Sequence, residues 1–554
     1  MLFKYIQSWK KAVSSFALSV LLFACNQPTK ELPLFEALSA EQTGIQFENK
    51  LHPNEQFNMF HYMYYYNGAG VGTGDFNNDG KADIFFASNE GDNQLYLNQG
   101  KLQFTEVSKQ AQIPQDSAWN TGVSVVDINN DGLLDIYICR LGNFEKFVSK
   151  NQLLICIGIE NGIPKYKEAA AEYGLDFSGF STQASFFDYD QDGDLDVFLL
   201  NHSVHQNGTF APRTSFMGTF DPLSGDRIFA NNNGRFEDVT KASKINSTAI
   251  SYGLGVVMSD INLDGWVDIY AGNDFHENDY LYINQKNGSF KDEQKERLMH
   301  TSQYSMGVDA ADLNNDGFPE IVSMDMLPKD PYILKRSLGE DDYDIYQYKI
   351  SVGYDYQFTR NNLQWNRRNG KFSEVGMYAG MFATDWSWAT LLMDFDNDGY
   401  KDIFVANGIP KRMNDMDYVN YVSNQEIQEK IRDNKMGEKD MALIDRFPEI
   451  KIPNQFFLNK KGLSFDDKEK AIVNNPPSYS NGAAYADFDN DGDLDLVVNN
   501  VNDKSFIYEN KSNQDTTAHS VSVTLKGAAK NINAIGAKLV LFTPGEIRTY
   551  EKFP

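Results

Sequence analysis

The chain has 554 residues, which allows two to four ordinary domains or one large repeat architecture. Its formal net charge is −27, and no part of the sequence has the basic residues expected of a groove that binds nucleic acid, which argues against nucleic acid as a partner. The sequence contains no serine-hydrolase, zinc-protease, phosphate-loop or dinucleotide-binding motif, so no catalytic residue and no organic cofactor is predicted.

The first 25 residues have the pattern of a bacterial export signal. Three lysines precede an apolar stretch over residues 12–24, which is too short to span a membrane and is followed by Cys25. This pattern resembles a lipoprotein signal, in which Cys25 becomes the lipidated first residue. We therefore predict a lipoprotein at the bacterial outer membrane or cell surface, with a periplasmic or secreted protein as the alternative. Residues 26–43 are interpreted as a linker.

One acidic nine-residue phrase recurs seven times, with Asp at position one, Asp or Asn at three, Asp-Gly at five and six, and a carboxylate at nine. Oxygens at alternate positions converge on one point if the backbone curls around it, and the glycine permits the sharp turn. Hard oxygen ligands in a flexible loop favour Ca²⁺, whereas a zinc site would need His or Cys. The sequence therefore predicts up to seven calcium loops, with side chains one, three, five and nine and the main-chain carbonyl of residue seven as ligands.

The predicted ligand residues, loop by loop, are Asp75, Asn77, Asp79, Lys81 and Asp83; Asp127, Asn129, Asp131, Leu133 and Asp135; Asp188, Asp190, Asp192, Asp194 and Asp196; Asp260, Asn262, Asp264, Trp266 and Asp268; Asp312, Asn314, Asp316, Phe318 and Glu320; Asp394, Asp396, Asp398, Tyr400 and Asp402; and Asp487, Asp489, Asp491, Asp493 and Asp495.

Two other interpretations of these loops are weaker. An EF-hand begins in the same way, but it requires Glu at position twelve and a helix afterwards. No copy has an acidic residue at position twelve, and a short apolar run such as residues 84–87 follows, which is typical of a buried strand. Simple Asp/Asn/Gly hairpin turns would not require a carboxylate at position nine in every copy.

Each repeat contains further strand-like segments. A run dense in small residues, such as 70–74, precedes several loops, as expected where strands crowd around a common axis. Downstream, a phrase such as residues 93–104 indicates strand, Asn/Gly turn and strand. Four strands in each of seven repeats predict an all-β, seven-bladed β-propeller over residues 44–512. The seventh repeat lacks its last strand, and residues 44–50 are predicted to supply it.

Three insertions, residues 201–226, 324–360 and 407–453, interrupt the repeats, and such segments usually decorate the face of a propeller where binding happens. His202 and His205 lie in the first, but no third metal ligand is evident nearby, so a structural or solvated pair is favoured.

Aromatic and cysteine residues near the loops have structural interpretations. Trp386, Trp388 and the tyrosines at 64–66 are interpreted as strand-packing residues in preference to sugar-stacking residues. Cys139 and Cys156 each lie in an apolar run, and two buried thiols are favoured over a disulfide across neighbouring strands.

The acidic loop followed by the Asn-x-Leu-Tyr-x-Asn, Gly and Phe phrase resembles the FG-GAP/VCBS repeats of integrin α-chain-type propellers. The resemblance implies a structural Ca²⁺ in each loop and an opposite face open to protein or glycan ligands. Residues 531–540 resemble the start of an ASPIC/UnbV domain, which follows such propellers in secreted proteins akin to cartilage acidic protein. We expect a partial, β-rich domain of this kind over residues 513–554 and regard the chain as a fragment of a longer protein.

These inferences favour a calcium-binding module for adhesion or ligand binding at the cell surface, attached to the membrane through Cys25. Two alternatives stay open. One is a calcium-assisted polysaccharide-active enzyme such as a lyase, and the other is a scaffold subunit of an outer-membrane assembly.

Overall fold

The computed structural model describes residues 33–116, 118–145, 147–205, 211–432, 435–514, 520–528 and 530–553. The chain divides into two units, Met1–Pro33 and Leu34–Pro554, and the second contains the fold described below. The predicted export signal and Cys25 lie outside the described residues. No helix within those described ranges is both long and apolar enough to cross a membrane.

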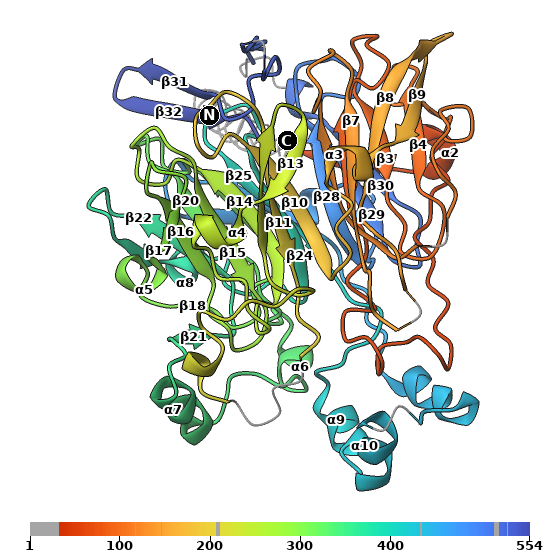
Figure 1. Ribbon diagram of the computed structural model, residues 1–554, viewed down its shortest axis with the longest axis vertical. Coiled ribbons are helices and arrows are strands. Elements are labelled where there is room, and N and C mark those ends of the chain that lie inside the picture. Colours follow the sequence, from red (N-terminus) through yellow and green to blue (C-terminus); the bar gives the residue numbers. More distant parts are fainter. Residues whose placement is uncertain are drawn as a thin grey trace, which may run out of the picture. The chain divides into compact units, whose positions relative to one another are not determined.

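Seven four-stranded antiparallel sheets form the blades of a β-propeller, which confirms the predicted fold class (Figure 1). Blades one to three consist of β2 (Val71–Gly74), β3 (Asp83–Phe86), β4 (Gln94–Asn98) and β5 (Phe104–Glu106); β6 (Asn120–Val126), β7 (Asp135–Arg140), β8 (Gln152–Glu160) and β9 (Ile163–Glu168); and β10 (Ser181–Phe187), β11 (Asp196–Asn201), β12 (Arg227–Asn232) and β13 (Arg235–Asp238). Blades four to six consist of β14 (Gly253–Ser259), β15 (Asp268–Asn273), β16 (Tyr280–Asn284) and β17 (Phe290–Asp292); β19 (Val308–Ala311), β20 (Glu320–Ser323), β22 (Asn362–Asn366) and β23 (Phe372–Glu374); and β24 (Ser387–Met393), β25 (Asp402–Asn407), β26 (Gln455–Asn459) and β27 (Phe465–Asp467). Blade seven consists of β28 (Ser480–Ala486), β29 (Asp495–Asn500), β30 (Phe506–Asn510) and β1 (Phe35–Leu38).

Short helices and two small sheets complete the described structure. The helical turns that follow outer strands are α2 (Ala40–Thr43), α3 (Ala170–Tyr173), α4 (Thr240–Ser243), α5 (Gln294–Arg297), α8 (Gly376–Ala379) and η3 (Glu469–Ala471). The insertions contain η1 (Arg213–Ser215), α6 (Pro331–Leu334), α7 (Tyr343–Ser351), α9 (Met416–Val422), α10 (Gln425–Arg432) and η2 (Glu438–Arg446). In a parallel pair, β18 (Thr301–Ser302) precedes blade five and β21 (Gln357–Phe358) lies between its strands β20 and β22 in sequence. The helix η4 (Ser512–Gln514) and the hairpin of β31 (Lys538–Thr543) and β32 (Glu546–Glu551) follow blade seven.

The first strand of each blade runs next to the first strand of its neighbour around the central axis, which explains its small residues. A Cβ on Gly122 would lie 2.4 Å from the carbonyl oxygen of Thr182 on the next blade. A Cβ on Gly482 would lie 2.6 Å from the carbonyl oxygen of Ala69. Only glycine permits backbones to approach so closely, so the small-residue runs are a requirement of the central packing.

The strand that closes blade seven is β1, so the prediction that residues 44–50 supply it is wrong. Phe35 in β1 pairs with Asn510 of β30, just as Phe104 pairs with Asn98 in blade one. Gly44 has a φ of 81° because it caps the C-terminus of α2. The Gly-x-x-Phe spacing at this point therefore comes from a helix cap, and the predicted linker at 26–43 contains both β1 and α2.

The two ends of the propeller carry different connections. All seven acidic loops join the first and second strands of a blade. The three insertions all join the second and third strands, in blades three, five and six, so they lie at the opposite end. Figure 1 shows α6, α7, α9 and α10 at the bottom and β31 and β32 at the top. We call these ends the insertion face and the loop face.

A central channel of about 1640 Å³ runs between the faces and is lined by the first strands of the blades. The aromatic segment 51–67 packs at the insertion-face end of the channel, where the Tyr62 hydroxyl lies 2.7 Å from His202 Nε2 in blade three. The ring of Phe60 in the same segment lies 6.1 Å from the ring of Phe447 in the third insertion. Segment 51–67 thus bridges distant blades across the axis.

The aromatic and cysteine predictions can be compared with the packing directly. Trp386, Trp388 and the tyrosines at 64–66 are buried in the core, as predicted. Cys139 and Cys156 are free and buried. Cys139 packs between blades two and three, whereas Cys156 packs between blades one and two, so the two thiols lie on opposite sides of one sheet.

Candidate functional site

The acidic loops share one backbone conformation. In all seven, residues four and six have positive φ angles, between 54° and 60° for residue four and between 83° and 96° for the glycine. This turn points the glycine N–H at the first aspartate, so Gly80 N donates to Asp75 Oδ2 at 2.8 Å. The equivalent bond occurs in every loop. The first aspartate therefore shapes the turn as well as facing its interior.

The carboxylate at position nine ties each loop to its blade. One oxygen of Asp83 accepts from Phe76 N at 3.0 Å, and the other accepts from Asn98 N in β4 at 2.7 Å. The same bonds recur in the other six loops. Burial raises the pKa of these carboxyls, to about 7 for Asp83 and about 9 for Asp495. A cation beside them would offset the cost of burying the ionised form.

Three loops bring carboxylate oxygens together closely enough to hold one ion. The oxygens of Asp188, Asp190 and Asp196 lie within 4.8 Å of one another. The same holds for Asp394, Asp396 and Asp402, and for Asp487, Asp489 and Asp491. In the described residues, the buried atoms Asp188 Oδ1 and Asp394 Oδ1 have no hydrogen-bond partner. A buried oxygen without a donor, among ligands that are all oxygens, fits a hard cation such as Ca²⁺.

The other four loops carry Asn at position three and therefore fewer negative charges. Asn77 Nδ2 lies 3.3 Å from Asp79 Oδ2, which keeps predicted ligands three and five together. In the fifth loop, Asn314 Nδ2 lies 3.3 Å from Glu320 Oε1, so ligands three and nine are adjacent there. These loops present the same oxygen donors with one charge less, which predicts weaker cation affinity than in the other three.

Basic side chains lie beside several loops, a feature that the repeat pattern alone does not predict. Lys81, proposed as a ligand through its carbonyl, also places its ammonium 2.8 Å from Asp79. Arg368 lies 2.6 Å from Asp316, and Lys286 lies 3.2 Å from Asp264. In the third loop, Lys530 lies 3.0 Å from Asp194. Each cation neutralises part of its loop, so the seven sites are electrostatically unequal.

The C-terminal segment, residues 520–553, rests on the loop face. Ser259 Oγ donates to Glu551 Oε2 at 2.6 Å, and Lys401 Nζ donates to the Thr549 carbonyl at 2.8 Å. Tyr400 Oη donates to Glu546 Oε1 at 2.5 Å. Residues from this segment also line the loop-face end of the channel. The loop face is thus partly covered by the chain itself, and the ASPIC/UnbV interpretation of this segment stays a prediction.

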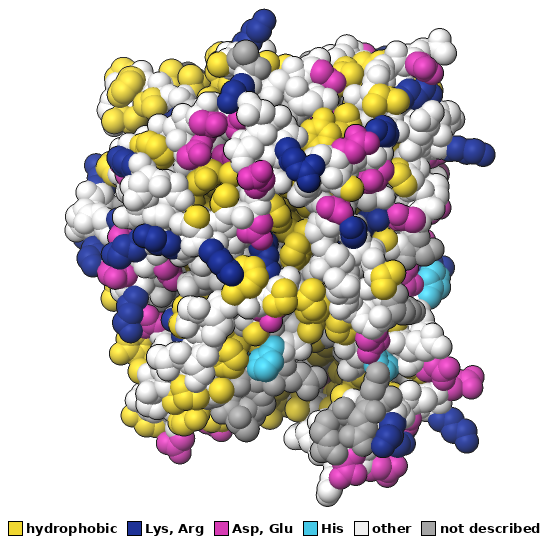
Figure 2. Space-filling view, viewed as in Figure 1, with side chains coloured by type: hydrophobic (Ala, Val, Ile, Leu, Met, Phe, Trp, Pro, Cys, Tyr) yellow, Lys and Arg dark blue, Asp and Glu magenta, His cyan; other side chains and the backbone are white. Residues whose placement is uncertain are grey.

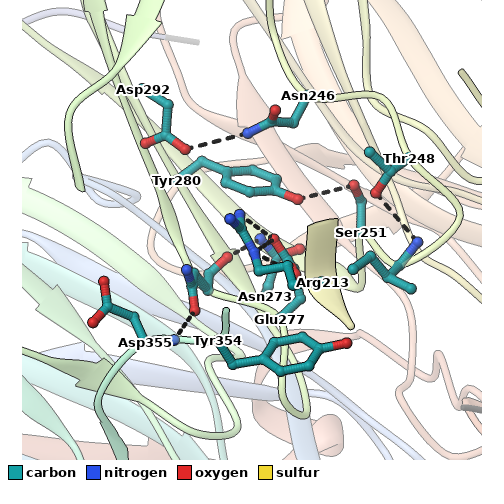
Figure 3. Close-up of polar contacts among 12 residues, drawn as sticks. Arg213, Asn246, Thr248, Ser251, Asn273, Glu277, Tyr280, Asp292, Tyr354 and Asp355 are labelled. Carbon is teal, nitrogen blue, oxygen red and sulfur yellow. Dashed lines mark hydrogen bonds and ion pairs between the residues drawn. The ribbon is translucent and has the colours of Figure 1, made fainter. Parts of the chain in front are cut away.

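The insertion face is anchored by a buried ion pair that sequence reasoning missed. Arg213 in the first insertion donates to both carboxylate oxygens of Glu277 at 2.7 to 3.0 Å (Figure 3). Glu277 is fully buried in the connection between β15 and β16. The second insertion contacts the same connection between β15 and β16, because Asp355 N donates to Asn278 Oδ1 at 2.9 Å. Blade four therefore fixes two insertions at once.

The second and third insertions are also joined to each other. Leu338 N donates to the Asn414 carbonyl at 2.7 Å, and Met416 N donates to the Arg336 carbonyl at 2.7 Å. The Arg336 guanidinium lies 2.9 Å from Asp415. Backbone pairing of this kind makes one connected platform from two segments that are far apart in the sequence.

This platform exposes aromatic side chains. Tyr343 and Tyr332 are 74% and 66% exposed, and Tyr348 and Tyr356 are also exposed. Hydrophobic side chains reach the surface at the end where Figure 1 draws α7 (Figure 2). Tyrosine combines apolar area with a hydroxyl and few rotatable bonds, which suits it to contacts with protein or sugar surfaces.

His202 has a structural position. Its ring nitrogens lie 2.7 Å from the Tyr62 hydroxyl and 3.1 Å from Thr182 Oγ1. Burial lowers the pKa of His202 to about 3, so the ring is neutral at physiological pH. The side chain of His205 is exposed, with its ring 5.7 Å from that of Phe216. His202 is therefore a buried structural residue and His205 a surface residue, in agreement with the favoured interpretation of the pair.

Comparison with known families agrees with this geometry. The FG-GAP-like repeat family matches residues 75–138, 188–271, 260–323 and 350–405, and three of these matches begin at the first aspartate of a loop. The matched residues contain FG-GAP-like repeats.

Curated relatives and solved structures resemble parts of the chain. Cartilage acidic protein 1 of Homo sapiens is 32% identical over 154 residues, which are 27% of this chain and 22% of that protein. Its counterpart in Xenopus tropicalis is 29% identical over 157 residues, 28% of this chain and 23% of that protein. The chain thus spans less than a quarter of the length of the relatives it matches.

Two solved structures have low similarity to this chain. An Agrocybe aegerita lectin that recognises non-reducing terminal N-acetylglucosamine has a TM-score of 0.37 and 14% identity, over 74% of this chain and 82% of that one. BBS1N in complex with ARL6DN has a TM-score of 0.40 and 8% identity, over 87% of this chain and 98% of that one.

Proposed function

We propose that the FG-GAP-repeat propeller is an exported, calcium-stabilised module that binds a protein or glycan ligand at the cell surface through its insertion face. One observation carries the proposal: all three insertions emerge at the same end, and two of them form a joined platform with exposed tyrosines. The family match and the likeness to cartilage acidic protein 1 support a binding module in preference to an enzyme.

Calcium is assigned to the seven loops. Residues one, three, five and nine would supply carboxylate or amide oxygens, and residue seven its main-chain carbonyl. An ion at about 20 times its Kd would stabilise the folded state by about 1.8 kcal/mol per loop. Elemental analysis of purified protein should find calcium near stoichiometry with the loops. Protein that contains no alkaline-earth metal after equilibration with millimolar CaCl₂ would reject this assignment.

The platform is tested with paired tyrosine variants. Fluorescently labelled protein is applied to a glycan array, and the Tyr343→Ser/Tyr348→Ser double variant is compared with Tyr378→Ser. Tyr378 is at least as exposed as these two tyrosines, but it lies on α8 after the outer strand of blade five. Loss of binding only in the double variant supports the proposed surface, whereas equal loss in both variants contradicts it.

The same preparation separates the alternatives. An array without any hit, together with crosslinking of the platform to an outer-membrane protein, would favour the scaffold function. A rising absorbance from unsaturated sugars upon incubation with acidic polysaccharides would reveal a lyase.

Lipid attachment is the proposed means of holding the protein at the membrane. Metabolic labelling with a fatty-acid analogue should mark the wild type and leave Cys25→Ser unlabelled. Labelling of both proteins, or of neither, would reject Cys25 as the anchor.

A further inference from the structure

The acidic loops are connected to one another by the side chain at position four. Asn78 Nδ2 of the first loop donates to the carbonyl of Gly132 in the second at 3.1 Å. Three equivalent bridges, also to the glycine of the following loop, are Gln191 to Gly265 at 2.6 Å, Asn315 to Gly399 at 3.0 Å and Asn490 to Gly80 at 3.4 Å. An amide at this position therefore reaches from one loop into the next around the ring.

The bridge joins the parts of both loops that shape the proposed cation sites. Residue four stands between predicted ligands three and five, so its backbone is fixed when both hold an ion. The glycine that receives the bridge donates its own N–H to the first aspartate of its loop, as Gly399 N does to Asp394 Oδ2 at 2.8 Å. A continuous series of hydrogen bonds thus leads from residue four of one loop through the glycine of the next loop to its first aspartate.

Three neighbouring pairs lack the bridge in the described part of the chain. In the second loop, Asn130 Oδ1 accepts from Ile532 N at 3.1 Å, which turns this side chain to the C-terminal segment. The fourth loop has Leu263 at position four, which has no donor. Asn397 of the sixth loop makes no bond to Gly492. The bridges therefore divide the loops into three groups. Loops seven, one and two form the first group, loops three and four the second, and loops five and six the third.

We propose that the residue-four amides are positioning residues that couple cation binding between bridged loops, so that the seven sites fill as three groups. The inference rests on the proposed calcium binding. An ion that orders one loop fixes the amide, which holds the glycine of the next loop and lowers the cost of ordering it. Coupling is reciprocal, so either loop of a pair favours the other. A neutral hydrogen bond of ordinary strength corresponds to about a two- to tenfold change in affinity.

Hydrogen exchange followed by mass spectrometry tests the coupling loop by loop. Peptides over 394–402 and 487–495 are monitored at increasing free Ca²⁺ in the wild type, Asn315→Gly and Asn397→Gly. Both asparagines have a φ of 56°, which glycine adopts freely, so neither substitution strains the backbone, and only Asn315 makes a bridge to the next loop. We expect the Ca²⁺ midpoint of peptide 394–402 to rise about two- to tenfold in Asn315→Gly, while peptide 487–495 keeps its midpoint in Asn397→Gly.

A gain-of-bridge variant completes the experiment. Leu263→Asn restores a donor at position four of the fourth loop, and it should lower the Ca²⁺ midpoint of peptide 312–320 in the fifth. An unchanged midpoint for 394–402 in Asn315→Gly, or an equal shift caused by Asn397→Gly, overturns the coupling and leaves calcium binding intact. Peptides that show no Ca²⁺-dependent protection in any loop would refute calcium binding itself, and the coupling with it.

Discussion

The two faces of the propeller are built in opposite ways. On the loop face, one nine-residue phrase is used seven times, and each copy makes the same backbone hydrogen bonds from positions one and nine. On the insertion face, the segments share no phrase, and their buried ion pairs differ, with Arg213 and Glu277 at the first insertion and Arg412 and Asp385 at the third. The difference teaches that the repeated residues make the architecture, whereas recognition is to be sought among the residues that are not repeated.

The largest expected effect comes from removing calcium from the loop face. Without an ion, each loop holds three or four carboxylates close together, and the position-nine group is buried as well. We expect EGTA to lower the melting temperature by tens of degrees in scanning calorimetry. Excess Ca²⁺ added to the same sample should restore it. A shift of only a few degrees would mean that the loops are held by their hydrogen bonds alone.

A smaller loss is expected from breaking the anchor of the insertion face. Glu277→Ala leaves the mostly buried Arg213 guanidinium without its carboxylate, which should cost about 3–5 kcal/mol in urea denaturation. Lys150→Ala is the control, because the Lys150–Asp176 pair is largely exposed and should contribute less than about 1 kcal/mol. Equal losses for the two variants would show that the first insertion is not anchored through blade four.

The next prediction concerns the pH dependence of stability and Asp226, the last residue of the first insertion, which directly precedes β12. Burial raises the pKa of Asp226 to about 8 from an ordinary value of 3.8. Between these values the unfolded chain has lost a proton that the folded protein keeps, so stability falls as pH rises from about 4 to 8. Asp226→Asn keeps an oxygen to accept from Asn201 N and removes the titration.

The measurement is the free energy of unfolding at several pH values at constant Ca²⁺. The slope should become flatter in Asp226→Asn, and the exposed Asp92→Asn should keep the wild-type slope. An identical slope in all three proteins would contradict the shifted pKa of Asp226.

The smallest effect on stability is expected at the platform tyrosines. Tyr343→Ser and Tyr348→Ser remove exposed side chains and should change the free energy of unfolding by less than about 0.5 kcal/mol. Ligand binding should fall nonetheless. A loss of several kcal/mol would show that these rings hold the insertions together, which would remove the argument for a recognition surface.

Much of the fold could be predicted from the sequence because the seven copies of the repeat can be compared with one another. Positions one, six and nine make the same backbone hydrogen bonds in every copy, so their residue types recur, and the blades follow from the strands between them. The last strand of blade seven was misplaced because Gly44, a helix cap, imitates the turn glycine of a hairpin.

The parts that could not be predicted are contacts between segments distant in the chain. Lys530 beside Asp194 and Arg213 beside Glu277 each occur once, so no internal comparison could reveal them. The loop of Asn78 and four other loops have Asn at position four, but the positive φ at this position explains that residue type without a bridge. The repeated pattern predicts the features that all copies share, whereas the contacts between copies are found only in the folded structure.

The pairing of β1 with β30 has a consequence for how the molecule is made. Blades one to six can each assemble as soon as their own strands are available, because their partners are neighbours in the chain. Blade seven must wait, with Phe35 unpaired, until Asn510 is available as well. This long-range step should be the slow one in folding. A protease that removed the first strand would open the circle without cutting any of the other six blades.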